Sequence, residues 1–174
     1  MCLASLGYSH AHDHPHVEAA ANMIDVEVRG NTDYFSTLYV GSHFDENHMV
    51  YDTMSDWTIV VGNHARGSSF PGNYDENESE TAKKVTRNLE GSNRALTASV
   101  DLGTVDFMGR VYKETMCLKQ LRGDRTKETG TFCLDDQEFL LATSMIGRFD
   151  ANGIVGLAPT GGIKSIVEQL KHSG

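Results

Sequence analysis

The stretch Val50-Tyr51-Asp52-Thr53-Met54-Ser55-Asp56-Trp57 decides how the rest of this chain is interpreted. An apolar run leads into Asp52-Thr53, and a second apolar run, Thr58-Ile59-Val60-Val61-Gly62, follows it. Far downstream stands a third short run, Asn152-Gly153-Ile154-Val155-Gly156-Leu157. Short apolar runs bounded by turn residues are typical of buried strands. Asp52 is therefore predicted at the end of a buried strand, where an aspartate either closes a turn or carries chemistry.

Most of the remaining chain has the pattern of short strands, and only its last segment has helical spacing. Ile163, Ile166, Val167 and Leu170 recur as on one face of a helix. The sequence predicts a mostly-β domain over 21–174 that ends in this helix, preceded by a His-rich tail over 1–20. The predicted strands lie around 26–28, 34–40, 49–51, 58–62, 95–100, 109–118 and 132–143, with a turn over 41–47 and a loop over 62–80.

Size and charge restrict the classes of function. A chain of 174 residues fits one domain with a real core. Lys and Arg number 15 against 24 Asp and Glu, a net charge of −9. This balance argues against nucleic acid as a partner, because that attraction depends on clustered Lys and Arg. No run of eighteen apolar residues exists, so the sequence predicts no membrane span.

The compartment stays open, with the secretory or endomembrane pathway favoured. Met1 to Leu6 is apolar but lacks a basic segment before it, so it fits either the tail of a secretory signal or an ordinary N-terminus. Cys117 and Cys133 lie in strand-like segments on either side of a polar turn, within reach of a disulfide across a hairpin, and two free buried thiols are the alternative. Asn77-Glu78-Ser79 is a candidate glycosylation sequon, a motif that also arises by chance.

Five segments in one order resemble the motifs of the N-terminal lobe of pepsin-like aspartic proteases. Each motif alone is weak, and their order over about residues 25–174 carries the resemblance. They are the strand Asp33–Gly41, the Asp-Thr-x-Ser of 52–55, the segment Tyr74–Ser79, the hairpin Leu102–Gly109 with Glu114-Thr115 after it, and Phe149–Leu157 with Pro159.

The resemblance implies a single pepsin-like lobe of orthogonally packed antiparallel sheets. Asp52 would lie on a loop crossed by the Gly153–Leu157 strand, and Leu102, Gly103 and Thr104 would form the flap. Pepsin-like enzymes have two such lobes, each giving one Asp. The two carboxylates share a proton, and one acts as a base toward water while the other acts as an acid toward the scissile carbonyl. No cofactor and no metal are implied.

Three positions depart from the motifs of the family beside the chemistry. Met54 stands where the family has a glycine whose small size leaves room near the carboxylates. Leu102 replaces the flap tyrosine and so removes a hydroxyl. Val105 replaces a flap glycine and is expected to stiffen the tip of the hairpin. Together the three changes argue against catalysis.

The sequence therefore leaves more than one function open. We expect a non-catalytic structural or interaction module, whose inter-lobe face meets a protein partner or a second lobe, because the chain ends about where an N-terminal lobe would hand over to the other. The alternative is an aspartic endopeptidase half-site completed by homodimerisation or by a second chain. There Asp52 is catalytic, Thr53 buttresses the contact between lobes and Ser55 hydrogen-bonds Asp52. Peptide binding without hydrolysis is a third possibility.

Histidines are concentrated in the tail, at positions 10, 12, 14 and 16. In an extended segment these imidazoles would lie on one side and suit a transition metal, whereas a solvated tail is the simpler interpretation. No ordered metal site is predicted.

Overall fold

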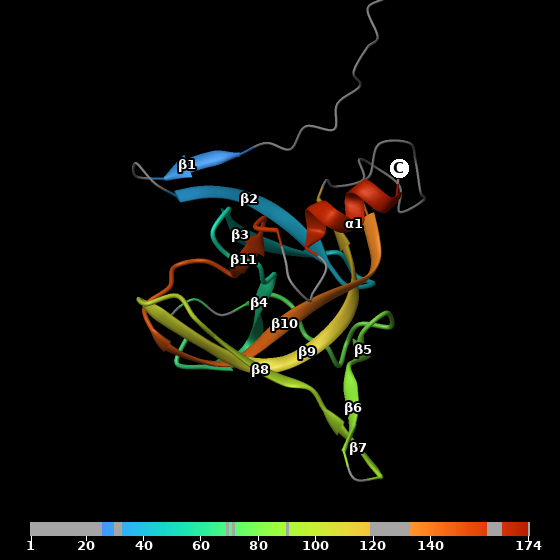
Figure 1. The fold of residues 1–174 in the computed structure, drawn as a ribbon. Helices are drawn as coiled ribbons and strands as arrows, with labels where there is room; N and C mark the ends of the chain where they lie inside the picture. Colours follow the sequence, from blue (N-terminus) through green and yellow to red (C-terminus); the bar gives the residue numbers. More distant parts are fainter. Residues whose placement is uncertain are drawn as a thin grey trace, which may run out of the picture.

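The computed structural model describes most of the chain between residues 26 and 173. Residues 1–25, 30–32, 69, 71, 90, 119–132, 160–164 and 174 lie outside the description. The His-rich tail, Cys2 and the predicted Gly30-Asn31 turn fall among them, so the boundary of the domain at residue 21 stays a prediction. The described chain is mostly strand and has one helix (Figure 1).

Nine strands form one mixed sheet. Their order is β1 (Glu27–Arg29), β2 (Asp33–Val40), β3 (Asp45–Asp52), β11 (Gly153–Gly156), β4 (Ile59–Arg66), β10 (Cys133–Gly147), β9 (Val105–Cys117) and β5 (Lys83–Lys84), with β8 (Thr97–Asp101) also on β9. An additional pairing between β2 and β9 joins distant strands of this order, so the sheet curls back on itself (Figure 1).

Two of the strand pairings are parallel, in a lobe that was expected to be built of antiparallel sheets. β10 runs parallel to β4, and β11 runs parallel to β3. Because parallel neighbours need a long crossover between them, local sequence patterns do not reveal these pairings. The expectation of a mostly-β lobe that ends in a helix is confirmed.

The apolar core divides into two clusters on opposite faces of the central strands. Val60 and Val155 belong to the first cluster, whereas Ile59 and Ile154, their neighbours in sequence, belong to the second. Successive side chains of a strand point to opposite faces, so these strands are buried on both sides. Their uninterrupted apolar sequences follow from this double burial.

The helix α1 (Ile166–Ser173) follows β11 and lies near one end of β10 (Figure 1). Ser165 precedes it as an N-cap: its hydroxyl accepts a hydrogen bond from the N–H of Glu168 at 3.2 Å. Ile166 is buried in the first core cluster. Among the residues whose spacing predicted the helix, Ile166 contacts the core, Val167 is 49 % exposed, and Ile163 lies outside the described residues.

A two-stranded ribbon, β6 (Thr86–Leu89) with β7 (Ser92–Ala95), extends away from the body of the lobe (Figure 1). Nearly all of its residues are exposed. β5, β6 and β7 have no signal in the sequence, because exposed strands need no alternation of apolar and polar residues. The boundaries of the predicted elements differ from the observed ones by a few residues. The turn expected over 41–47 ends at Phe44, and β4 continues to Arg66, into the loop expected over 62–80.

Candidate functional site

The Asp52 loop, residues 52–58, joins β3 to β4 and is crossed by β11. Asp52 is the last residue of β3 and pairs with Gly156 of β11. The N–H of Leu157 donates to the carbonyl of Asp52 at 2.9 Å, and the N–H of Ala158 donates to the carbonyl of Ser55 at 3.0 Å. The expected crossing of this loop by the 153–157 strand is confirmed.

Gly156 is required for this crossing. A Cβ atom at this position would lie 2.5 Å from the carbonyl oxygen of Trp57 and 2.8 Å from that of Ser55. Carbon atoms do not approach oxygen so closely, so a side chain here would push β11 off the loop. The segment before β11 is held by Asn152, whose side-chain oxygen accepts from the N–H of His48 at 2.8 Å. The loop is therefore fixed from both of its flanks.

The carboxylate of Asp52 makes one hydrogen bond in the described part of the chain. Its Oδ1 accepts from the N–H of Met54 at 2.8 Å. This is the backbone donor that the motif provides at its third position. Asp52 is half-buried, and no side chain among the described residues is hydrogen-bonded to its carboxylate.

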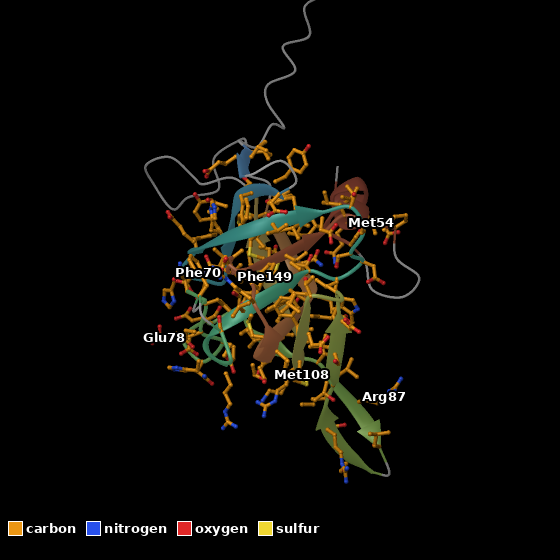
Figure 2. The ribbon with its side chains drawn as sticks, turned by 90° about the vertical axis from the view of Figure 1, so that its left-hand side faces the viewer. Met54, Phe70, Glu78, Arg87, Met108 and Phe149 are labelled. Atoms are coloured by element: carbon orange, nitrogen blue, oxygen red, sulfur yellow. A yellow bond between two sulfur atoms is a disulfide. The ribbon has the colours of Figure 1, made fainter. Side chains whose placement is uncertain are left out.

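Met54 carries its side chain into solvent. It is 88 % exposed, the most exposed of the large apolar side chains described, and it lies at the edge of the molecule (Figure 2). Thr53 beside it is exposed as well. Trp57, at the other end of the loop, is partly buried and packs against the second core cluster, as expected of a core residue.

Ser55 does not make, in this single lobe, the hydrogen bond to Asp52 that the half-site alternative predicts. Its hydroxyl donates to the carbonyl of Trp57 at 3.1 Å and accepts from the N–H of Trp57 at 3.2 Å. Since a hydroxyl has one hydrogen, Ser55 does not also donate to Asp52. The residue is buried and shapes the Asp52 loop from within instead.

Leu102, Gly103 and Thr104 form the turn of the β8–β9 hairpin, where the resemblance places a flap. The N–H of Leu102 donates to the carbonyl of Val105 at 3.0 Å, and the N–H of Gly103 donates to Oδ1 of Asp101 at 2.6 Å. Gly103 has φ +79°, a left-handed conformation that favours glycine. Gly103 and Thr104 are exposed. That these residues act as a flap remains a prediction.

Val105 is not part of the exposed tip, which corrects its expected role there. It is buried at the start of β9 and belongs to the second core cluster. Across β10 it pairs with Gly147, where a Cβ atom would lie 3.0 Å from Cα of Val105. Val105 thus packs beneath the hairpin rather than at its tip.

Glu114 accepts more hydrogen bonds than any other acid of the described chain, a role that its sequence motif does not indicate. It is buried, at 1 % exposure, within β9. Its carboxylate accepts hydrogen bonds from the hydroxyls of Tyr74 and Ser79, both at 2.7 Å, from the hydroxyl of Thr81, and from the N–H of Thr115 at 2.8 Å. Burial and the bond to Glu114 raise the pKa of Tyr74, so its phenol keeps the proton that it donates.

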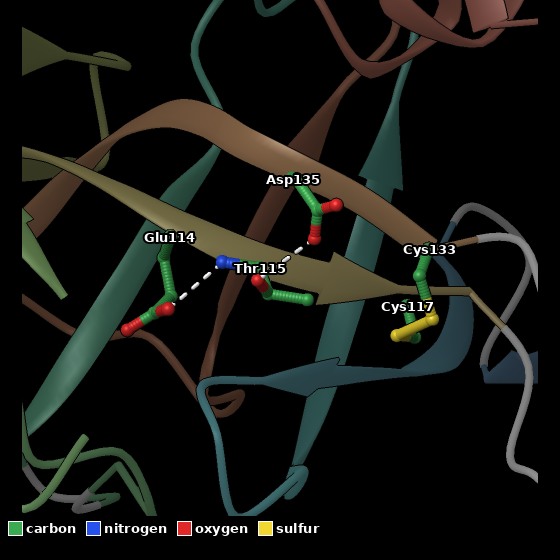
Figure 3. Close-up of a disulfide and its surroundings, with 5 residues drawn as sticks. All are labelled: Glu114, Thr115, Cys117, Cys133 and Asp135. Atoms are coloured by element: carbon green, nitrogen blue, oxygen red, sulfur yellow. Dashed lines mark hydrogen bonds between the residues drawn. A yellow bond between two sulfur atoms is a disulfide. The ribbon is translucent and has the colours of Figure 1, made fainter. Parts of the chain in front are cut away.

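A disulfide joins Cys117 at the end of β9 to Cys133 at the start of β10, as the sequence allowed. The two residues are directly opposite each other in the register of the strands. Figure 3 shows the bridge at the end of the hairpin, with Thr115 and then Glu114 farther back along β9 and Asp135 on the neighbouring strand. The hydroxyl of Thr115 donates to Oδ1 of Asp135 at 3.1 Å, so both this hydrogen bond and the disulfide connect β9 to β10.

The described part of the chain contains no group of three or more His, Cys, Asp or Glu side chains placed to hold a metal ion. No described helix is long and apolar enough to cross a bilayer. Asn77, the glycosylation candidate, is exposed on the loop after Tyr74.

The fold is a single pepsin-like lobe. One matching solved structure is the aspartic proteinase from Irpex lacteus, with a TM-score of 0.59 and 19 % sequence identity. The match covers 82 % of this chain and 36 % of the proteinase, so the chain spans about a third of that protein's length. No protein-family model matches the sequence, and neither does any curated protein.

Proposed function

We propose that this lobe is a pepsin-like peptidase homologue that does not hydrolyse peptides by itself and that works as a structural or interaction subunit. The observation that carries the proposal is the isolation of Asp52. Its carboxylate accepts one hydrogen bond, from the N–H of Met54, and no second carboxyl group is bonded to it among the described residues.

Cleavage by two aspartates requires one ionised and one protonated carboxyl group in contact. The contact itself produces this state, because two like charges about 3 Å apart do not both ionise. The ionised group takes a proton from water while the protonated one donates to the scissile carbonyl. A carboxylate without such a partner has no neighbour to divide these two roles with, which supports the absence of catalysis in the lobe alone.

The residues around Asp52 support the same proposal. Met54 puts a long, solvent-exposed thioether two residues after Asp52, at a position where the motif has a glycine. Leu102 brings no hydroxyl to the turn of the hairpin. Neither residue can donate a hydrogen bond from its side chain to a substrate.

A protein partner is the proposed occupant of the face that carries the Asp52 loop. Met54 is almost fully exposed on this loop, next to the exposed Thr53. Exposed methionine is frequent at binding surfaces, because its flexible, polarisable side chain adapts to the partner. The partner chemistry that fits is an apolar patch on a protein chain or on a second lobe.

A peptidase assay at about pH 3–5, where a carboxyl pair holds one proton, tests the catalytic half of this proposal. Wild-type chain, Asp52→Asn and Asp56→Asn are compared on a denatured protein substrate. Asp56 is a matched control, since it is exposed on the same loop. We expect the three proteins to be equally inactive. Cleavage by wild type and Asp56→Asn that disappears in Asp52→Asn would overturn the proposal.

A second candidate is an acid peptidase half-site that becomes complete when another chain supplies a second aspartate. The intact geometry of the Asp52 loop favours it: β11 crosses the loop, and the N–H of Met54 faces the carboxylate. In this case Asp52 is catalytic, Thr53 supports the contact between lobes, and Ser55 acts through the shape of the loop.

Concentration dependence separates this candidate from the first. If two copies complete the site, the rate per chain at about pH 4 rises with protein concentration until the dimer is saturated, and sedimentation detects that dimer over the same range. A rate of zero at every concentration excludes the homodimer. A rate that appears only after a second protein is added identifies a heteromeric site.

A further inference from the structure

The loop after Tyr74 holds the single Asn-x-Ser/Thr sequon of this sequence, Asn77-Glu78-Ser79. Asn77 and Glu78 are exposed in a turn. Figure 2 shows Glu78 and Met54 toward opposite sides of the molecule. We propose that Asn77 carries an N-linked glycan and that the glycan is attached before this loop folds.

The folded loop has room for a glycan on Asn77. The side-chain nitrogen of Asn77 donates to Oδ1 of Asp75 at 2.9 Å, and the backbone N–H of Asn77 donates to the same oxygen at 2.9 Å. An asparagine amide has two hydrogens, and N-glycosylation replaces one of them. The other can keep the bond to Asp75, so the modified residue retains its conformation while the sugar extends into solvent.

Ser79 shows why attachment must come first. Its hydroxyl donates to the buried carboxylate of Glu114 at 2.7 Å and accepts from the N–H of Ser42 at 3.1 Å. The sequon is recognised through this hydroxyl together with the asparagine. Once the loop has folded onto Glu114, the hydroxyl is engaged within the protein and is not available to an enzyme.

The disulfide provides an independent argument for the compartment. Cys117 and Cys133 are bridged, and disulfides persist in oxidising compartments such as the endoplasmic reticulum and the cell exterior. N-glycosylation belongs to that same route. Cys117 also lies three residues after Glu114 on β9. The disulfide that closes the β9–β10 hairpin and the hydrogen bond from Ser79 to Glu114 therefore involve the same strand.

The chemistry of the step is a glycosyl transfer from a lipid-linked diphosphate oligosaccharide. A bond forms between the side-chain nitrogen of Asn77 and the anomeric carbon of the donor sugar. The bond from that carbon to the diphosphate oxygen breaks, and its electron pair leaves with the lipid diphosphate. The amide nitrogen loses one proton to a base of the transferring enzyme, and nothing is oxidised or reduced.

The first test asks whether the site is used. The full chain is secreted from yeast behind a cleavable leader, and its mobility is compared before and after treatment with peptide-N-glycosidase. We expect the glycan to lower the mobility of the secreted chain and peptide-N-glycosidase to abolish this difference. The same treatment should convert Asn77 to aspartate, which peptide mass spectrometry detects. Asn77→Gln should lack the shift. Asn93→Gln, an exposed asparagine outside any sequon, and Ser79→Thr should keep it. Secreted, disulfide-bonded wild type without a glycan would overturn the site.

The second test asks when the glycan is attached. Two samples of unglycosylated chain are compared as substrates of purified oligosaccharyltransferase with its lipid-linked donor. The first is folded chain with an intact disulfide, made in the bacterial periplasm. The second is the same chain after reduction, unfolding in urea and dilution. We expect the folded chain to be modified more than about tenfold more slowly, because only the open population of the loop presents Ser79. Equal rates would overturn the proposed order of events, whatever the first test shows.

Discussion

Asp52 and Glu114 both end up beside backbone N–H groups, yet their surroundings differ in almost every other respect. Asp52 is half-buried on a loop and accepts one hydrogen bond, from the N–H of Met54. Glu114 is buried inside a long strand and accepts from three hydroxyls as well as from the N–H of Thr115. Folding would change little if the first carboxylate were lost, and much if the second were. Asp52 is thus free of a structural duty, whereas Glu114 has one.

Replacing Glu114 by alanine should have the largest effect. Each buried donor left without an acceptor costs about 1–3 kcal/mol, and Tyr74 is fully buried with its phenol aimed at this carboxylate. We expect the free energy of unfolding, measured by urea denaturation at pH 7, to fall by about 3 kcal/mol or more. Glu80→Ala, an exposed acid of the same loop, serves as the control. Equal losses in the two variants would show that Glu114 has no special role.

Removing the disulfide should have the next largest effect. The bridge closes a loop with a sequence separation of 16, and a loop of about this size is associated with roughly 3 kcal/mol of stabilisation. Cys117→Ser with Cys133→Ser is compared with the oxidised wild type by thermal and urea unfolding. A double variant as stable as wild type would mean that the bond to Asp135 and the strand pairing hold the hairpin by themselves.

Tyr74→Phe removes one donor from Glu114 without leaving a large cavity. A hydrogen bond to a charged group contributes about 1.5–3 kcal/mol, so a loss in this range is expected at pH 7. Burial and Glu114 raise the pKa of Tyr74 above its ordinary value of 10.0. The unfolded chain therefore releases this proton first, and stability should fall as the pH rises above about 10.

The pH dependence separates Tyr74 from the other tyrosines whose pKa is raised. Burial also raises the pKa of Tyr51 and of Tyr39, and both residues are present in both proteins. Urea midpoints measured between neutral pH and pH 11 should therefore decline in both, and less steeply in Tyr74→Phe. Parallel curves would contradict the assignment of the alkaline loss to Tyr74.

Asp52→Asn should have the smallest effect on stability. An asparagine oxygen can accept the same bond from the N–H of Met54, and the side chain is half-exposed. We expect the free energy of unfolding to change by less than about 0.5 kcal/mol, as for most surface substitutions. A loss several times larger would show that Asp52 is part of the folding core, and the contrast with Glu114 would fail.

Sequence alone predicted the parts of this lobe that depend on local pattern. The uninterrupted apolar runs around Ile59 and Ile154 indicated buried strands, and both lie between the two core clusters. The spacing around Ile166 indicated the helix. Cys117 and Cys133 were placed on facing strands because a polar turn separates two apolar segments.

What sequence missed depends on contacts between distant segments. The three hydroxyls on Glu114 come from a loop about forty residues upstream, with separations of 40, 35 and 33 along the chain. Val105 was expected at an exposed tip, but the approach of Gly147 buries it. The half-site alternative predicts a bond from Ser55 to Asp52, whereas in this lobe the hydroxyl points toward Trp57. Exposed strands such as β6 and β7 leave no apolar pattern to detect.

A crystal structure of the protein grown at about pH 4, where a carboxyl pair would hold one proton, examines the isolation of Asp52 without relying on any assay. We predict that its carboxylate will accept the N–H of Met54 and that no carboxyl group of any molecule will hydrogen-bond to it. A second carboxyl group within hydrogen-bonding distance of Asp52, from another copy or another chain, with Met54 turned aside, would contradict the proposal that this lobe is inactive.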